Sequence, residues 1–223
     1  MTIKNKVSQI KGVIFDLDGT LLNTLPDIAA AANKALEKFG YPSHPENRIK
    51  NYLGNGSRVL ITNAMPKDRQ SREFVEPVLE YYLDKYKNLE QEKSKPYEGI
   101  ENLLEELKKR NIKTAIVTNK NDFLAEQCVR KFIPDFSFMA VIGQNENYPA
   151  KPHRYMADKA LNAMGEKNED CIFMGDSSVD IKTGLNAGIK TIGVTWGFRP
   201  KKELADAGAW KIIDHPMDIL KFL

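Results

Sequence analysis

The sequence is poor in cysteine and histidine, and this shortage excludes two kinds of protein. Its 223 residues contain two cysteines, Cys128 and Cys171, and three histidines. The cysteines form no CxxC pair, and no Cys/His cluster has the spacing of a zinc site, so a zinc centre and a disulfide framework are both excluded. We expect two buried thiols in a reducing compartment.

The sequence also lacks a strong excess of charge and long apolar runs. Lysine and arginine total 33 against 30 aspartates and glutamates, and the net charge of +3 is too small to indicate a nucleic acid or an anionic membrane as partner. No apolar run approaches the roughly 20 residues that cross a bilayer. Residues 1–12 carry lysines but no long apolar segment, unlike a signal peptide. We therefore expect a cytoplasmic protein that binds neither nucleic acid nor membrane.

Short apolar runs alternate with helical patterns through most of the chain. The runs suit strands that are buried on both faces of a parallel sheet, and they fall at residues 13–15, 113–118, 138–142, 171–174, 191–195 and 210–213. Helices are predicted at 99–110, 122–132, 153–164 and 178–187. Asn121 is the expected N-cap of the second helix, and Gly165 and Gly188 close the last two. This alternation indicates an α/β fold with a doubly wound parallel sheet.

Residues 22–95 break the alternation, because no strand pattern in them is convincing. Helices are predicted at 26–39, 47–53, 57–64 and 71–88, and Pro77 either kinks the last helix or begins a new one. We interpret residues 22–95 as an α-helical cap domain that is inserted into an α/β core made of residues 1–21 and 96–223. The charged run at 84–95 is interpreted as a solvated helix end and linker.

The first predicted strand runs directly into Asp16-Leu17-Asp18-Gly19-Thr20. Ligands of open α/β sheets bind at the carboxyl ends of the strands, and carboxylates two positions apart on a strand can face the same way. One carboxylate can attack phosphorus, and a second, when protonated, can donate to the leaving oxygen. Gly19 lets the backbone turn tightly beside an anion. The alternative is an ordinary turn whose aspartates cap the next segment.

Other predicted strands end in groups that suit phosphate and a metal. Thr118 and Asn119 offer a hydroxyl and an amide, and Lys151 offers a point charge just before a helix. Asp176 and Asp180 can complete an oxygen-only site that suits Mg²⁺. Each group alone has an ordinary interpretation as a loop start, a surface lysine or a helix cap. Four such strand ends in order favour one phosphate and metal site.

The segments FDLDGTLLNT, VTNK, KPHRY and GDSSVD resemble, in order and spacing, the four motifs of the haloacid dehalogenase superfamily of phosphatases. The resemblance covers essentially the whole chain. Within the superfamily the chain is most similar to the phosphoglycolate phosphatases and their near relatives, in the stretches YLGNGSRVL, PYEGI and GVTWGFRPKKELADAGAWKIIDHP. The resemblance implies the superfamily's α/β core with a helical cap inserted after the first motif.

The resemblance also implies the roles of four aspartates. Asp16 would attack phosphorus and become an aspartyl-phosphate, and Asp18 would protonate the leaving alkoxide and then activate water. Mg²⁺ would be held by Asp16, the backbone carbonyl of Asp18, and Asp176. Asp180 would orient the metal's water ligands or Lys151. An acid at position 18 is what distinguishes phosphatases from the dehalogenases of the superfamily.

The remaining implied site residues hold the phosphoryl group and the leaving group. Thr118, with the backbone of Asn119 and Gly19, would hold the transferring phosphoryl group. Lys151 would neutralise the phosphoryl group and the nucleophile.

In the cap, Gly54, Asn55 and Arg58 are the candidates for contact with the substrate. Glycines flank Asn55 and would let that loop approach a ligand closely, and Arg58 could pair with a substrate carboxylate. The alternative is a loop that begins a helix, with Arg58 in solvent.

We expect an enzyme that hydrolyses small phosphomonoesters, with 2-phosphoglycolate the leading substrate and glycolate and phosphate the products. The alternatives within the superfamily are a sugar-phosphate phosphatase, a nucleotidase, a pyrophosphatase and a β-phosphoglucomutase. A catalytically silent binding protein on the same fold is a further alternative, which the presence of all four motif residues Asp16, Asp18, Lys151 and Asp176 opposes. A monomer and a homodimer are both compatible with the sequence.

Overall fold

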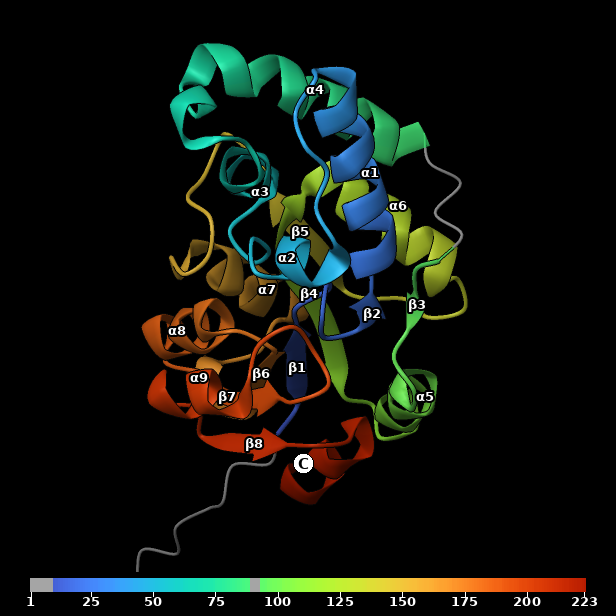
Figure 1. Cartoon of the computed structure of the whole chain (residues 1–223). Coiled ribbons are helices and arrows are strands. Elements are labelled where there is room, and N and C mark those ends of the chain that lie inside the picture. Colours follow the sequence, from blue (N-terminus) through green and yellow to red (C-terminus); the bar gives the residue numbers. More distant parts are fainter. Residues whose placement is uncertain (1–9, 89–92) are drawn as a thin grey trace, which may run out of the picture.

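The computed structural model describes residues 10–88 and 93–223, and its centre is a six-stranded parallel sheet (Figure 1). The strand order is β5-β4-β1-β6-β7-β8. The bounds of these strands are β1 Gly12–Phe15, β4 Lys113–Asn121, β5 Ala140–Gln144, β6 Cys171–Gly175, β7 Lys190–Val194 and β8 Lys211–Ile213. The doubly wound sheet predicted from the sequence is thereby confirmed. From β1 the chain adds β4 and β5 on one side and β6, β7 and β8 on the other, and such a change of direction places a crevice at the carboxyl end of the strand where it occurs.

Helices cover both faces of the sheet. In β1, Val13 and Phe15 pack in one apolar cluster with residues of α5 (Ile100–Lys109) and α6 (Asp122–Phe132). Ile14 faces the opposite way and packs with residues of α7 (Tyr155–Met164) and α8 (Ser178–Ala187). Because both faces are buried, the strands are apolar at successive positions instead of alternating with polar residues.

Several predicted helix ends coincide with capping groups in the structure. The Asn121 side chain accepts from the backbone N–H of Leu124 at the start of α6. Gly165 and Gly188 are left-handed, with φ of 66° and 71°, and end α7 and α8. The short helix α9 (Lys201–Asp206) and the 3₁₀ helix at Pro216–Phe222 have no counterpart in the predictions, because neither is long enough to show a helical period.

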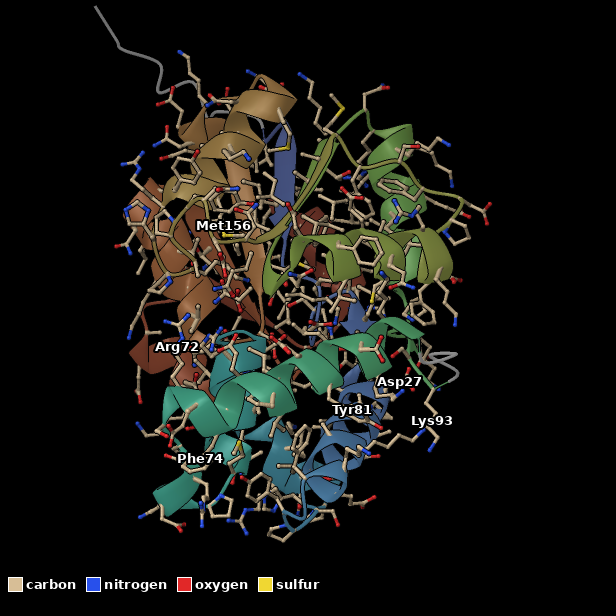
Figure 2. All side chains as sticks on the ribbon, turned by 90° about the horizontal axis from the view of Figure 1, so that it is seen from above. Asp27, Arg72, Phe74, Tyr81, Lys93 and Met156 are labelled. Carbon is tan, nitrogen blue, oxygen red and sulfur yellow. The ribbon has the colours of Figure 1, made fainter. Side chains whose placement is uncertain are left out.

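Among the described residues, the 3₁₀ helix Lys67–Arg69 and four α-helices lie between the short antiparallel strands β2 (Leu22–Asn23) and β3 (Lys95–Pro96). Their bounds are α1 Leu25–Lys38, α2 Glu46–Lys50, α3 Ser57–Ala64 and α4 Arg72–Asn88. Helix α4 runs through Pro77, so the alternative of a new helix beginning there is wrong. Asp27 holds the start of α1 against the other end of this segment, since its carboxylate accepts from the backbone N–H and the hydroxyl of Ser94. Figure 2 shows Asp27 beside Lys93, the residue before Ser94.

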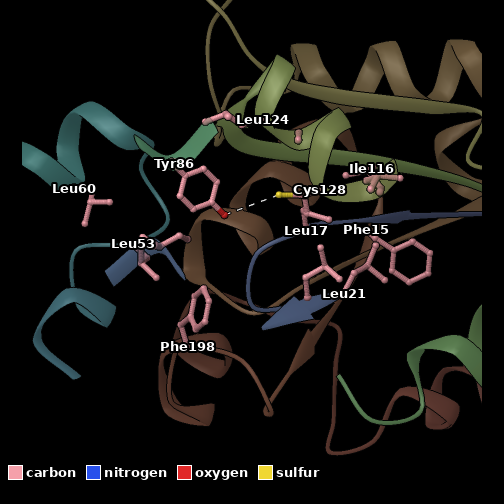
Figure 3. Packing of buried hydrophobic residues seen from close by; sticks show 14 of the residues in the cluster. Phe15, Leu17, Leu21, Leu53, Leu60, Tyr86, Ile116, Leu124, Cys128 and Phe198 are labelled. Carbon is pink, nitrogen blue, oxygen red and sulfur yellow. Dashed lines mark hydrogen bonds between the residues drawn. The ribbon is translucent and has the colours of Figure 1, made fainter. Parts of the chain in front are cut away.

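Side chains from these four helices and from the sheet share one apolar cluster. Figure 3 shows Leu53, Leu60 and Tyr86 facing Leu124 and Phe198 across it. Residues 89–92, part of the predicted linker, and residues 1–9, most of the segment judged unlike a signal peptide, lie outside the described residues. None of the helices in the described part of the chain combines the length and the apolar character of a membrane span.

Candidate active site

A cavity opens at the carboxyl ends of β1, β4 and β6, beneath helices α1, α3 and α4. Its volume is about 60 Å³. The sheet side is lined by Asp16, Asp18, Thr118, Asn119, Lys120, Leu124, Lys151, Asp176, Ser177, Phe198 and Arg199. The helical side is lined by Ile28, Leu53, Gly54, Gly56, Ser57, Leu60 and Tyr82. The structure thus brings the predicted residues of all four motifs to one place.

Asp16 follows β1 directly and is held by its backbone, whose N–H donates to the carbonyl of Met174 in β6 at 2.9 Å. One carboxylate oxygen, Oδ1, accepts from the backbone N–H of Leu17 at 2.7 Å and lies 2.8 Å from the Lys151 Nζ. Within residues 10–88 and 93–223 the other oxygen, Oδ2, accepts no hydrogen bond. Asp16 therefore presents one restrained oxygen and one that can react.

Lys151 is the cation of this cluster, and its side chain is 2% exposed. Its Nζ lies 2.7 Å from Asp180 Oδ1, 2.8 Å from Asp16 Oδ1 and 3.0 Å from the carbonyl of Val117. Burial alone would lower the pKa of Lys151, but the carboxylates of Asp16 and Asp180 outweigh burial and raise that pKa above its ordinary value of 10.5. Lys151 is thus held charged, with all three of its donors directed at named groups.

Asp16, Asp176 and Asp180 are buried, and each offers a carboxylate oxygen within 4.8 Å of those of the other two. Burial, and after it repulsion from Asp180, raises the pKa of Asp16 from 3.8 to about 7, against the opposing effect of Lys151. Burial, Asp180 and Asp16 likewise raise the pKa of Asp176 well above 3.8. A divalent cation with a preference for oxygen would offset this repulsion, so the donor set fits a metal such as Mg²⁺.

Asp180 differs from the other two carboxylates, because both of its oxygens are already engaged. Oδ1 accepts from Lys151, and Oδ2 accepts from the backbone N–H and the hydroxyl of Ser177 at 3.0 and 2.6 Å. Asp180 thereby stabilises the start of α8 and holds Lys151 at the same time. These contacts favour a supporting position for Asp180 over direct contact with a metal.

Gly19 allows the loop after β1 to approach the carboxylate of Asp176. Its φ of 89° lies in the left-handed region, and a Cβ at this position would contact the carboxylate of Asp176. The backbone N–H of Phe198 donates to Asp176 Oδ2 at 2.6 Å from the other side. Residues 19 and 198 thus hold Asp176 in place over the end of β1.

Thr118 and Asn119 lie in a part of β4 where the register with β5 shifts, between Val117 and Asn121. Such irregularities re-aim side chains next to active sites. The Asn119 amide oxygen accepts from the backbone N–H of Lys151 at 2.9 Å, and its Nδ2 donates to the carbonyl of Gly54 at 2.9 Å. Asn119 therefore joins the lysine loop to the loop before α3.

Asp18 is held by two side chains that sequence reasoning did not select. The Thr24 hydroxyl donates to Asp18 Oδ1 at 2.7 Å, and Lys120 Nζ lies 3.1 and 3.2 Å from the two carboxylate oxygens. The sequence did place Lys120 next to Asn119, inside the segment VTNK. Its burial was the missing information, since a lysine in a motif is otherwise taken for a surface residue.

The structure brings only some of the cap candidates to the cavity. Gly54 lines the cavity, whereas Asn55 and Arg58 are not among the described residues that line it. Arg58 makes two hydrogen bonds to Glu76 at the protein surface. Arg199, which sequence reasoning did not select, lines the cavity and donates to the carbonyl of Leu53 at 2.7 Å.

A carboxylate oxygen free to react, a fixed cation, a carboxylate suited to a metal and a second acid therefore meet at one edge of the sheet. This combination suits attack on phosphorus, because the anionic nucleophile and the anionic phosphate need neighbouring positive charge. The second carboxylate, on Asp18, can exchange a proton with an oxygen that leaves from the far side of the phosphorus.

Residues 13–194 match the model of a protein family described as haloacid dehalogenase-like hydrolase. The chain is 31% identical to a phosphoglycolate phosphatase of Mannheimia succiniciproducens, over 97% of this chain and 99% of that protein. It is also 31% identical to an N-acetylmuramic acid 6-phosphate phosphatase of Pseudomonas aeruginosa, over 98% and 96%. A crystal structure from Haemophilus somnus, described as a predicted phosphoglycolate phosphatase, superposes with a TM-score of 0.88 at 30% identity, covering 96% of this chain and 98% of the other.

Proposed function

Because the chain belongs to the haloacid dehalogenase-like hydrolase family, we propose that this phosphoric monoester hydrolase forms an aspartyl-phosphate at Asp16 and requires Mg²⁺. The observation that carries the proposal is the pairing of one restrained and one reactive oxygen on a buried carboxylate, between Lys151 and Asp176. A carboxylate that only capped a turn would not need a buried cation and two further buried acids around it.

In the proposed first step, Asp16 Oδ2 attacks phosphorus, and the bond between phosphorus and the ester oxygen breaks. The electron pair of that bond leaves with the ester oxygen, which takes a proton from Asp18. In the second step Asp18 accepts a proton from water, and the water oxygen attacks phosphorus. The bond between phosphorus and Asp16 Oδ2 breaks, its electron pair restores the Asp16 carboxylate, and phosphate leaves.

The other residues of the site stabilise charge and hold the phosphoryl group. Lys151 neutralises Asp16 and the phosphoryl oxygens, and the Thr118 hydroxyl and the backbone of Asn119 and Gly19 bind the phosphoryl group. Mg²⁺ would be held by Asp16, the backbone carbonyl of Asp18, and Asp176, and it would offset the repulsion between the nucleophile and the phosphate. Asp180 keeps Lys151 in position.

The leading substrate in this proposal is 2-phosphoglycolate. The cavity of about 60 Å³ is small beside the roughly 300–1,000 Å³ of pockets that hold drug-sized ligands. A leaving group of a few atoms, such as glycolate, fits such a cavity better than a sugar does. Similarity to phosphoglycolate phosphatases of more than one bacterium, at 31% and 30% identity over nearly the whole of each chain, supports the same choice.

The proposal extends to the arrangement and the setting of the protein. Residues 22–95 would act as a cap that closes over a core of residues 1–21 and 96–223 and excludes water from the reaction. The candidate roles of Asn55 and Arg58 at the substrate belong to this part of the proposal. The protein would act in the cytoplasm on a small-molecule phosphomonoester, without nucleic acid or membrane as partner, as a monomer or a homodimer.

The proposed function is tested by measuring phosphate release with Mg²⁺ from 2-phosphoglycolate, N-acetylmuramic acid 6-phosphate, hexose phosphates, nucleotides and pyrophosphate. We expect 2-phosphoglycolate to have the highest kcat/KM, and we expect the Asp16→Asn variant to release no phosphate. Acid quenching during turnover followed by mass spectrometry should locate phosphate on Asp16. A better kcat/KM for another substrate would correct the substrate, and turnover by the Asn variant would refute the mechanism.

A further inference from the structure

Two cations line the cavity without a part in the proposed chemistry, Lys120 and Arg199. Arg199 has a visible structural task, since its guanidinium donates to the carbonyls of Leu53 and Asn51 at 2.7 and 3.3 Å. The side chain of Lys120 is 4% exposed. Burial of an ammonium group is costly unless the charge is paired, and we therefore looked at what Lys120 contacts inside the cavity.

Lys120 lies between the proposed acid and a helix of the cap. Its Nζ is 3.1 and 3.2 Å from the two oxygens of Asp18, and it donates to the hydroxyl of Tyr86 in α4 at 2.9 Å. The ammonium also lies 4.4 Å from the centre of the Tyr86 ring. The Asp18 carboxylate pairs with this ammonium and favours its charged form, so Lys120 is a cation beside Asp18.

The two buried lysines of the cavity differ in how completely they are bonded. Lys151 directs its three donors at three separate groups, at 2.7, 2.8 and 3.0 Å. Among the described residues Lys120 has two partner groups, and its contacts with Asp18 are longer. Two of the three donors of Lys120 are shared by the two oxygens of one carboxylate, at 3.1 and 3.2 Å, so one of them can turn to a second carboxylate while the other holds Asp18.

The cavity wall offers few other polar groups to a leaving group. Its helical side presents Ile28, Leu53 and Leu60, with the hydroxyls of Ser57 and Tyr82 as its polar side-chain groups, and α6 contributes Leu124. A site of this kind leaves the hydroxyls of a sugar unpaired, which disfavours such a substrate. A small group that carries one negative charge matches an apolar wall with a single available cation.

We propose that Lys120 determines substrate specificity by binding a carboxylate on the leaving group of the phosphomonoester. The inference rests on the proposed phosphatase function, which places the leaving oxygen next to Asp18. In phosphoglycolate one methylene carbon joins this oxygen to the carboxyl group. A leaving oxygen that reaches Asp18 therefore brings the carboxylate to the ammonium that lies against the same aspartate. Tyr86 is the positioning residue, because it fixes Lys120 from the cap.

The experiment compares 2-phosphoglycolate with its neutral amide, 2-phosphoglycolamide, which has the same shape and the same number of heavy atoms. We measure kcat and KM with Mg²⁺ for the wild type and for Lys120→Met, Lys120→Gln and Lys120→Arg. In the wild type kcat/KM should favour the carboxylate. The Met and Gln variants should lower this preference about 30-fold or more, mainly through KM, because a charge-assisted hydrogen bond is lost. The Arg variant should retain much of the preference.

Arg199→Met is the matched control, since it removes the other cation that lines the cavity. It should lower kcat/KM for the two substrates by the same factor. Equal losses on both substrates in the Lys120 variants would overturn the proposal, because Lys120 would then only hold Asp18. The Gln variant keeps the side-chain polarity and decides the matter if the Met variant does not fold.

Hydrolysis of p-nitrophenyl phosphate by the wild type separates this inference from the proposed function. Turnover of that ester without a preference between the acid and the amide would overturn the role of Lys120 and leave the phosphatase function standing. Absence of turnover with every ester would refute both.

Discussion

Replacement of Asp16 by asparagine should stabilise the metal-free protein at pH 8, although it removes the proposed nucleophile. Burial and the neighbouring Asp180 raise the pKa of Asp16 from 3.8 to about 7. The ionised carboxylate is therefore less favourable in the folded protein than in the unfolded chain. A rise of this size corresponds to at most about 4 kcal/mol. Lys151 keeps Asp180 and the Val117 carbonyl as partners in the variant.

The raised pKa of Asp16 also determines how the stability of the metal-free protein depends on pH. Below about pH 4 Asp16 is protonated in both states and carries no penalty. Between about pH 4 and pH 7 the unfolded chain loses the proton while the folded protein retains it, so the wild type loses stability as the pH increases. Above about pH 7 Asp16 is ionised in both states, and the folded protein bears the full free-energy cost of the buried charge. The stability of the Asp16→Asn variant should change less with pH between about pH 4 and pH 7 than the stability of the wild type.

The assay is thermal unfolding followed by circular dichroism, in EDTA and in 10 mM Mg²⁺, at pH 5 and pH 8. In EDTA at pH 8 the Asn variant should melt about 5–15 °C above the wild type, since 1 kcal/mol shifts the midpoint by roughly 2–4 °C in a chain of this size. Mg²⁺ should stabilise the wild type more than the variant. Asp158, which is half-buried and pairs with Arg154 at the surface, is the control when replaced by Asn and should shift the midpoint by no more than about 2 °C.

An Asn variant that melts at or below the wild-type temperature in EDTA at pH 8 would refute this reasoning. It would mean that Lys151 compensates Asp16 fully without a metal, and that the crowding of carboxylates does not call for a cation. A wild type whose stability rises between pH 5 and pH 7 in EDTA would lead to the same conclusion.

Three further predictions follow from single contacts. Lys151→Met should lower the melting midpoint by roughly 10 °C at pH 8, because breaking a buried ion pair costs about 3–5 kcal/mol, and an unchanged midpoint would contradict the charge arrangement. Gly184→Ala should destabilise by about 1–3 kcal/mol in urea unfolding, since the new Cβ would overlap the Thr191 hydroxyl, and the further change Thr191→Ala should recover part of the loss. Arg58→Ala should change KM for 2-phosphoglycolate by less than about twofold, because Glu76 already binds this guanidinium; a rise of tenfold or more would show that the cap brings Arg58 to the substrate.

The parallel sheet and its helices followed from local patterns in the sequence. Apolar runs of three to six residues and helical spacing located the strands and most of the helices, because side-chain period and capping residues act within one element. The helix at 122–132 and its cap at Asn121 are an example. Elements too short to show a period, such as α9, were missed for the same reason.

The gathering of the motif residues was also foreseeable, since parallel strands present their carboxyl ends at one edge of the sheet. Asp16 and Asp176 each follow such a strand directly, and Thr118 lies near the end of another, so their order in the chain was enough to bring them together. The supporting contacts of Asp180 were foreseen in part, as an interaction with Lys151.

The environment of the charged side chains was decided only by the tertiary structure. Lys120 is buried because α4 places Tyr86 over it and Asp18 lies opposite, and these partners are 34 and 102 residues away in sequence. Arg58 faces Glu76 on a neighbouring helix instead of the cavity. A sequence states where charges lie along the chain, but burial and pairing depend on elements that meet only after folding.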